Sequence, residues 1–452
     1  MKTLPRWLWR LVITVLVVAS VACDSDPAGR PTAGSAAPAR ASATTAPTGS
    51  ARDTGPDAAA SQDQRLNVIV ILVDCLRADR MPWAGYAHDV VPNIAAFAKR
   101  AVTYTRFYAL SSYTAMSVGG IYAGRYPSEV QRSGYFFSSY PDEEVMFPEL
   151  LQQARVRTMA AQGHWYFNKD KAGLHQGFDV WEIVPGLKKS NTTDQNITSP
   201  AYLKLAQAQL GKAANRDQPF FAWYHFLDPH DMYMGHKGIP TFGRGARGLY
   251  NGELYFTDQH VGKLLDFIAA QPWADRTAII VSADHGETFG EHDMYRHGFE
   301  LWEELVHVPL LVHLPGIEPR TIAVPRSAID LAPTILELLE VKPDSATQGT
   351  SLVAELRGAE PQIRPVIIDL PRTSDNDRRR ALIWGRHKLI AHGDDEYFKL
   401  FDLKADPGEQ RDLARKEPEL LQRLRQRYLE VSKTIKDVCP KVRNKLKGRK
   451  KG

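Results

Sequence analysis

The sequence predicts an α/β fold in which a mostly parallel central sheet is flanked by helices. Three continuous apolar runs, at residues 67–73, 219–227 and 277–282, are rich in β-branched or aromatic side chains. Such runs are typical of strands buried on both faces. Helical patterns lie between them, for example at residues 92–100 and 252–270. Alternating buried strands and helices indicate this fold class.

Each of the three runs ends at a polar residue of the kind that binds metals. The first run stops at Asp74, the second at Asp228-Pro229-His230 and the third at Asp284-His285. Ligands of open parallel sheets bind beyond the carboxyl ends of the strands. A single Asp after a strand is usually a turn or a helix cap. Three such endings favour a shared site at one edge of the sheet.

The last part of the body has a different pattern. Short alternating segments at residues 381–384, 387–390 and 397–403 predict a small antiparallel sheet. A charged amphipathic pattern at about residues 417–433 predicts a helix after it.

The N-terminus has the pattern of an export signal. Its basic side chains are Lys2, Arg6 and Arg10. The apolar run that follows, residues 11–22, is shorter than the roughly 20 residues that span a bilayer. Small residues before Cys23 look like a bacterial lipobox, although Ser20 replaces the usual Leu. We expect a lipoprotein with Cys23 as the lipidated residue, and ordinary cleavage after Ala22 or an uncleaved anchor are the alternatives.

The composition divides the chain into five expected segments. The stretch after the signal is rich in Ala, Ser, Thr, Pro and Gly and has no aliphatic run, so it reads as a flexible tether. The expected segments are a signal peptide (1–22), a disordered tether (23–64), a catalytic α/β domain (65–360), a C-terminal α+β subdomain (361–436) and a basic tail (437–452).

The overall composition is that of an ordinary globular protein. The 452 residues are 43% hydrophobic and 24% charged, and the formal net charge is +5. Much of that charge lies in the tail, which is either a solvated end or a contact for anionic lipid or a polyanionic substrate. No aromatic-and-basic motif suggests nucleic acid. With only Cys23, Cys75 and Cys439, a disulfide framework is not expected.

A divalent metal site is expected from two carboxylates and an imidazole: Asp74, Asp284 and His285. The imidazole favours zinc or manganese, with calcium as the alternative. Glu287 is either a partner of a metal ligand or a capping residue. His297 follows 12 residues after His285 and is a further candidate.

Thr114 is the candidate nucleophile. A polar loop at residues 111–113 leads into an apolar segment that Gly124 ends, which predicts a helix beginning at Thr114. Free N–H groups at a helix N-terminus favour an anion, and a metal could deprotonate the hydroxyl. The alternative is that Thr114 only caps the helix.

Several motifs together resemble the sulfatase family of the alkaline phosphatase superfamily. They follow in the family's order between about residues 66 and 415, and they are NVIVILVDCLRAD (67–79), VPNI (91–94), AGRYP (123–127), LDPH (227–230), SADHGE (282–287), AIDLAPT (328–334) and LFDLKADPGE (400–409). The resemblance implies an alkaline-phosphatase-like fold. Counting ten positions back from Gly124 implies that Thr114 is the nucleophile.

The resemblance also implies roles for individual residues. The implied metal ligands are Asp74, Thr114, Asp284 and His285. His230 is implied as a catalytic and substrate-binding residue, because the His of the family's Asp-Pro-His turn contacts the ester group. His297 is expected to share these roles, since a His 12 residues after the Asp-His pair is similar to that of phosphoethanolamine transferases.

Two departures from the family pattern change the expected chemistry. Sulfatases carry a C/S-x-P-x-R motif whose first residue becomes formylglycine, whereas this chain has Thr114, Met116 and Val118. No formylglycine is therefore expected, and Thr114 resembles the nucleophile of phosphoryl-transfer relatives. Cys75 stands where many relatives have a second Asp.

The expected function is metal-dependent hydrolysis of sulfate or phosphate esters, with one divalent ion. The alternatives are a phosphoethanolamine-type phosphoryl transferase and a non-catalytic sulfatase-like binding protein. The expected partners are a small-molecule, glycan or lipid ester and a membrane reached through Cys23. The expected location is the cell envelope, with secretion as the alternative.

Overall fold

The computed structural model describes residues 65–188, 196–438 and 440. The predicted signal peptide, the tether with Cys23, and nearly all of the basic tail lie outside these described residues. Within them, none of the helices has the length and apolar character needed to cross a bilayer. Cys75 is buried and forms no disulfide.

A nine-stranded sheet forms the centre of the fold, in the order β10-β2-β9-β6-β1-β5-β3-β4, with β11 beside β2. All its neighbouring pairs are parallel except those that β9 makes with β2 and β6. This confirms the predicted mostly parallel sheet. The strands are β1 (Asn67–Val73), β2 (Val102–Tyr108), β3 (Arg157–Gln162), β4 (Val180–Ile183), β5 (Phe220–Phe226), β6 (Thr277–Ser282), β9 (His307–His313), β10 (Thr321–Ile322) and β11 (Arg326–Ser327).

The register of the three central strands decides which side chains can meet. Leu72 of β1 lies opposite His225 of β5 on one side and Ser282 of β6 on the other. Side chains alternate between the two faces of a sheet. Asp74 lies two residues beyond Leu72, and Asp284 lies two residues beyond Ser282. Both carboxylates therefore point to the same face as His225.

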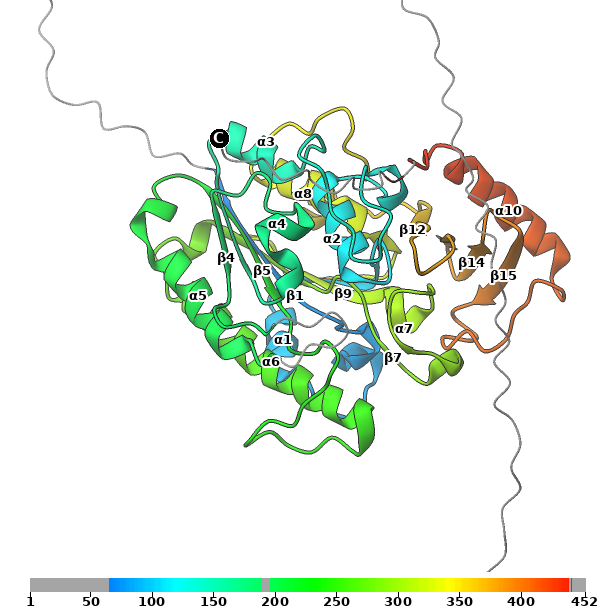
Figure 1. Ribbon diagram of the computed structural model, residues 1–452, viewed down its shortest axis with the longest axis horizontal. Coiled ribbons are helices and arrows are strands. Elements are labelled where there is room, and N and C mark those ends of the chain that lie inside the picture. Colours follow the sequence, from blue (N-terminus) through cyan, green and yellow to red (C-terminus); the bar gives the residue numbers. More distant parts are fainter. Residues whose placement is uncertain (1–64, 189–195, 439, 441–452) are drawn as a thin grey trace, which may run out of the picture. The chain divides into compact units, whose positions relative to one another are not determined.

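Helices cover both faces of the sheet, as Figure 1 shows. Helix α6 contacts both α1 and α5 on one face, whereas α2, α3 and α8 group on the other. Their bounds are α1 (Pro92–Ala98), α2 (Thr114–Ala123), α3 (Phe147–Gln153), α4 (Lys169–Ala172), α5 (Ser199–Gly211), α6 (Gly245–Ala269), α7 (Glu303–Val306), α8 (Leu331–Leu338) and α9 (Val353–Leu356). Helix α6 begins seven residues before the predicted start.

Helix α2 is buried almost all round. Every residue of α2 after Thr114 is buried, so this helix is held by packing rather than by an amphipathic face. It ends at Gly124, whose φ of 60° is the left-handed conformation that favours glycine at a helix end. The predicted helix bounds are thus confirmed.

The C-terminal part forms a four-stranded antiparallel sheet with helix α10 (Pro418–Ser432) against it. Its strands are β12 (Val366–Leu370), β13 (Arg379–Trp384), β14 (His387–His392) and β15 (Tyr397–Asp402). The small sheet and its helix were predicted, whereas β12 was not. A short hairpin, β7 (Thr288–Phe289) with β8 (Tyr295–Arg296), follows the third central strand.

Buried hydrogen bonds and ion pairs of charged side chains connect the small sheet to the rest of the described chain. Asp369 of β12 accepts hydrogen bonds from the backbone N–H and the hydroxyl of Ser128, at 2.7 and 2.9 Å. The fully buried ammonium of Lys388 lies 3.0 Å from both Glu303 and Glu409. Breaking a buried ion pair leaves an uncompensated charge, so these contacts specify where the sheet docks.

Candidate active site

The predicted metal ligands meet beyond the carboxyl ends of β1 and β6. The imidazole Nε2 of His285 lies 3.4 Å from Asp284 Oδ2 and 3.7 Å from Asp74 Oδ1. All three side chains are fully buried. His285 Nδ1 lies 2.8 Å from the carbonyl oxygen of Gly286. If Nδ1 carries the proton and donates it to this carbonyl, Nε2 keeps its lone pair toward the two carboxylates.

Thr114 points its hydroxyl into the same group. Its Oγ1 lies 3.1 Å from His285 Nε2 and 3.4 Å from Asp74 Oδ2. Thr114 is the first residue of α2, and the capping position belongs to Tyr113, which makes no side-chain cap. Thr114 therefore does not occupy the capping position of this helix. Its hydroxyl lies instead where free N–H groups of a helix end favour negative charge.

His225 joins this group although the sequence did not single it out. Its Nε2 lies 3.3 Å from Asp74 Oδ2 and 3.7 Å from Asp284 Oδ2, and the ring is fully buried. It sits inside an apolar strand, where a lone His is ordinarily a core residue. The signal that could have revealed it is register, because it lies opposite Leu72 and so shares a face with Asp74.

The charges in this group shift one another's pKa. Burial raises the pKa of Asp74, but the neighbouring His225 and His285 rings lower it more, so it falls well below its usual value. Burial lowers the pKa of His225, but Asp284 and Asp74 raise it to about 10. For His285, burial dominates and the pKa falls below its ordinary value, so its ring is neutral at neutral pH.

His297 lies beside the group and is held by Glu287. Its Nδ1 is 3.2 Å from both carboxylate oxygens of Glu287, which also accepts a 2.7 Å hydrogen bond from Tyr233. Burial lowers the pKa of His297, but Glu287 raises it more, and the net shift is upward. Among the described residues, the side-chain partners of Glu287 are His297, Tyr233 and Cys75, which are not predicted metal ligands, so its role as the partner of a metal ligand stays a prediction.

His230 completes the set of predicted residues. Its ring centroid lies 5.0 Å from that of His297 and 5.9 Å from that of His164. Asp228, two residues earlier, does not join the site. Its carboxylate accepts hydrogen bonds from the backbone N–H groups of Thr198 and Ser199 at the start of α5, at 2.5 and 2.8 Å.

Cys75 occupies a left-handed backbone conformation, with φ of 60°, directly after Asp74. Its Sγ lies 3.0 Å from Asp74 Oδ1 and 3.7 Å from Glu287 Oε2. Burial, followed by the surrounding carboxylates, raises the pKa of this thiol well above its usual value. The thiol therefore stays protonated in the metal-free protein and donates to Asp74.

An aromatic stack flanks Thr114. Tyr113, next to Thr114, stacks on Phe136 at a centroid distance of 4.3 Å, and Phe136 stacks on Phe299 at 5.6 Å. The neighbouring Phe137 is 52% exposed. Apolar surface of this kind beside a polar centre is common in ligand sites.

The donor set fits a divalent cation. Asp74, Asp284 and His285 bring their ligand atoms within 4.8 Å of one another. Asp284 Oδ2 is buried and has no hydrogen-bond donor among the described residues. Buried carboxylates without donors are ordinarily paired with a charge or a metal.

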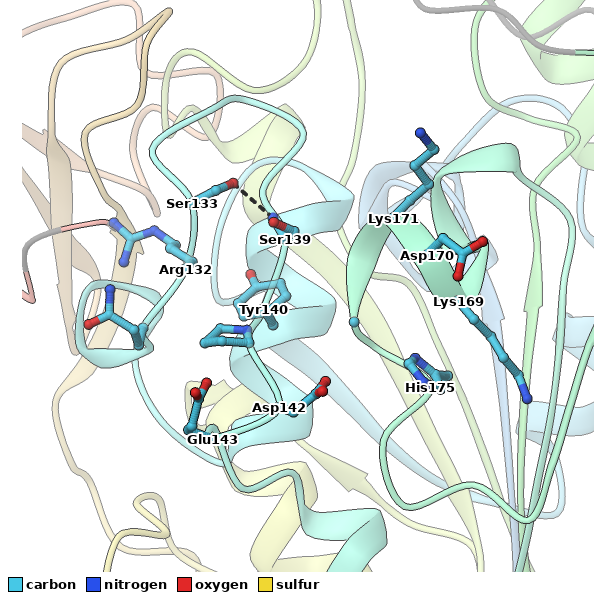
Figure 2. A pocket seen from close by; sticks show the side chains of 13 residues that line it. Arg132, Ser133, Ser139, Tyr140, Asp142, Glu143, Lys169, Asp170, Lys171 and His175 are labelled. Atoms are coloured by element: carbon cyan, nitrogen blue, oxygen red, sulfur yellow. Dashed lines mark hydrogen bonds between the residues drawn. The ribbon is translucent and has the colours of Figure 1, made fainter. Parts of the chain in front are cut away.

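A cavity of about 770 Å³ lies apart from these residues, and Figure 2 shows its charged lining. It opens between the loop that carries Arg132 and Asp142 and the segment that carries Lys169 and His175. None of the candidate catalytic residues lines it. Tyr140 separates the two sites, because it lines the cavity while its hydroxyl donates a 2.6 Å hydrogen bond to the carbonyl oxygen of Ala115 in α2.

Solved structures of similar fold include a hydrolase of phosphonate monoesters. A phosphonate monoester hydrolase of Agrobacterium radiobacter is 19% identical, with a TM-score of 0.68, over 82% of this chain and 96% of that one. The structure of Ps i-CgsB in complex with k-i-k-neocarrahexaose is 20% identical, with a TM-score of 0.67, over 82% of this chain and 94% of that one. These likenesses confirm the predicted fold class.

Relatives found by sequence similarity are sulfatases. An ulvan-active sulfatase of Formosa agariphila is 25% identical over 66% of each chain. The choline-sulfatase of Rhizobium meliloti is 24% identical over 77% of this chain and 82% of that one. The sulfatase family model matches residues 66–341, and the model of the C-terminal part of N-sulphoglucosamine sulphohydrolase matches residues 290–434. As its motifs predicted, the chain belongs to the sulfatase family of ester hydrolases.

Proposed function

We propose that this protein hydrolyses sulfate or phosphate esters with Thr114 as the nucleophile and one divalent ion held by Asp74, Thr114, Asp284 and His285. The observation that carries the proposal is the position of Thr114 Oγ1, 3.1 Å from His285 Nε2 and 3.4 Å from Asp74 Oδ2 at the start of a buried helix. When bound, the ion supplies a Lewis acid that favours the deprotonated hydroxyl and neutralises oxyanion charge.

The first half of the proposed reaction transfers the sulfuryl or phosphoryl group to Thr114. The Thr114 hydroxyl loses its proton to solvent, and its oxygen forms a bond to sulfur or phosphorus while the bond to the substrate's alcohol oxygen breaks. His297 gives a proton to the departing alcohol, because Glu287 raises its pKa and keeps it protonated to higher pH. His230, next to His297, binds the oxygens of the ester.

The second half releases the acid and restores the enzyme. Water attacks the sulfur or phosphorus of the threonine ester, the bond to Thr114 breaks, and inorganic sulfate or phosphate leaves. The two protons of the water return to the Thr114 oxygen and to His297. In a transferase, a non-water alcohol would attack at this stage. Because one structure of similar fold is a phosphonate monoester hydrolase, phosphorus esters should be tested beside sulfate esters. Because one sequence relative is an ulvan-active sulfatase, sulfated sugars should be tested as well.

A substrate panel with two nucleophile variants tests the proposal. The zinc- or manganese-loaded protein is assayed on an aryl sulfate, a sulfated sugar, a phosphate monoester and a phosphate diester. We expect turnover of at least one of these and a loss of at least about 10³-fold in kcat for Thr114→Ala, because the covalent step is removed. Thr114→Ser should retain part of the activity.

Equal activity of the wild type and Thr114→Ala would refute the role of Thr114. Product analysis in the presence of glycerol separates the two reaction types. Release of inorganic sulfate or phosphate identifies a hydrolase, and a glycerol ester as the main product identifies a transferase. Absence of turnover on the whole panel, together with absence of bound metal, would favour a binding protein.

We also propose that the protein is exported and anchored through a lipid on Cys23. The basic start, the apolar run at residues 11–22 and the small residues before Cys23 support this location. Metabolic labelling with a fatty-acid analogue in a bacterial host tests it. Labelling of the wild type that is lost in Cys23→Ser is expected, whereas equal labelling of both would contradict the anchor.

A further inference from the structure

Five donor atoms form a closed ring at the centre of the site. His225 Nε2, Asp74 Oδ2 and Thr114 Oγ1 follow one another at 3.3 and 3.4 Å. His285 Nε2 lies 3.1 Å from Thr114 Oγ1 and 3.4 Å from Asp284 Oδ2. Asp284 Oδ2 lies 3.7 Å from His225 Nε2, which closes the ring. Ligand atoms that lie about 2.0–2.2 Å from one ion are separated from their neighbours by roughly 3.0–3.6 Å. Four of the five spacings lie within this range, and the fifth, between Asp284 and His225, is 3.7 Å.

The surroundings of His225 are unusual for a buried histidine. Its Nδ1 has no hydrogen-bond partner in the part of the chain that the structure describes, and its Nε2 faces only the carboxylates of Asp74 and Asp284, at 3.3 and 3.7 Å. A core histidine is normally satisfied, as His260 shows with its Nδ1 2.8 Å from the carbonyl oxygen of Phe256. His225 instead points Nε2 between two carboxylates, one of which, Asp284, also has an unpartnered oxygen.

The fold explains how this strand can supply a ligand. His225 and Asp74 share a face of the sheet because β1 and β5 are parallel and in register. The position next to Asp74 carries Cys75 in place of a carboxylate, and its Sγ makes its shortest contact with Asp74 Oδ1. His225 offers a donor on the opposite oxygen of the same carboxylate, Oδ2.

We propose that His225 is a ligand of the divalent ion and that, with His285, it makes the site select zinc over calcium. This inference rests on the proposed function, since it concerns the same ion. Two imidazoles, two carboxylates and a hydroxyl form a donor set that suits zinc, whereas calcium prefers six to eight oxygen atoms. Removing one imidazole should therefore weaken zinc binding far more than calcium binding.

The first test uses the wild-type protein and needs no substitution. The protein is stripped with a chelator, reloaded with one equivalent of zinc, and examined by X-ray absorption at the zinc edge. We expect scattering from two imidazoles. A spectrum that fits one imidazole would overturn the proposal and leave the ligands Asp74, Asp284 and His285 intact.

The second test measures affinity for zinc alone and calcium alone, by competition with a chromophoric chelator. His225→Ala should lower the zinc affinity at least about 10-fold and change the calcium affinity less than threefold. His260→Ala is the matched control, a buried imidazole outside the ring, and should leave zinc affinity unchanged. Circular dichroism of the metal-free forms confirms that each variant is folded.

The outcomes separate this inference from the proposed function. Unchanged zinc affinity in folded His225→Ala, with binding lost in Asp284→Asn, would exclude His225 as a ligand and preserve the metal site. If the wild type bound neither zinc nor calcium stoichiometrically, both this inference and the proposed metal-dependent function would be overturned. Should His225→Ala not fold, the X-ray absorption result on the wild type still decides.

Discussion

Gly119 of helix α2 should be intolerant of even one additional methyl group. A Cβ added there would lie 2.0 Å from the hydroxyl oxygen of Tyr140 and 2.1 Å from its Cζ. Ordinary contacts begin at 3.4 Å, so the ring would have to withdraw by more than 1 Å. Tyr140 is buried, and its hydroxyl bonds to the carbonyl oxygen of Ala115, which is the residue after Thr114.

The expected cost follows from three terms. Overpacking of a buried side chain costs about 1–3 kcal/mol. Loss of the Tyr140 hydrogen bond costs about 1 kcal/mol. Replacing a helical glycine by alanine returns up to about 1 kcal/mol of helix propensity. Gly119→Ala should therefore lower the free energy of unfolding by about 1–3 kcal/mol, and kcat should fall because the first turn of α2 shifts with Thr114.

Urea denaturation followed by tryptophan fluorescence measures this change, and a double-mutant cycle isolates its cause. In a Tyr140→Ala background the added methyl has room, so Gly119→Ala should be neutral or slightly stabilising there. Gly252→Ala in α6 is the control, because its Cβ would meet nothing closer than 3.9 Å. If Gly119→Ala had the same cost in both backgrounds, within about 0.5 kcal/mol, the packing argument would be refuted.

Three further predictions address charge and metal. Lys388→Met leaves Glu303 and Glu409 as buried carboxylates without their cation, so unfolding in urea should show a loss of about 3–5 kcal/mol; a loss below 1 kcal/mol would contradict the pairing. Burial, followed by nearby cations, lowers the pKa of His392 to about 3, so the folded protein holds this ring neutral and stability should fall as the pH drops from 6.5 toward 3. His392→Phe should flatten that slope by up to about 1.4 kcal/mol per pH unit between pH 6 and 5, and an unchanged slope would exclude this residue as its source. Asp284→Asn should lose bound metal in elemental analysis, and chelation of the wild type should lower its melting temperature while leaving that of the variant unchanged.

The sequence pattern alone predicted those helices and strands that are long or strongly apolar. The strands β1, β5 and β6 were predicted because each is a continuous apolar run, and α2 because a polar loop and Gly124 bound it. The two-residue strands β10 and β11 were not predicted, because pairing with β2 and not their own sequence makes them strands. The early start of α6 was missed because its first turns are polar and glycine-containing.

The same distinction applies to the site. Asp74, Thr114, Asp284 and His285 follow recognisable motifs, and the structure brings them together, while their roles stay predictions. His225 has no motif of its own, since its place in the site depends on the pairing of two strands far apart in the chain. Tyr233, which donates a hydrogen bond to Glu287, was missed because it lies in a loop and belongs to no recognisable motif.

The arrangement of polar side chains at the ends of apolar strands has a consequence for how such proteins diversify. The apolar residues that pack β1, β5 and β6 together belong to the hydrophobic core, whereas the candidate site lies beyond the ends of these strands. An exchange such as Cys for Asp at position 75, or a substitution at position 114, changes the candidate site and leaves the packing of the strands in place. A few substitutions beyond the strand ends can therefore change the ester chemistry of such a fold, because the core packing does not have to change with them.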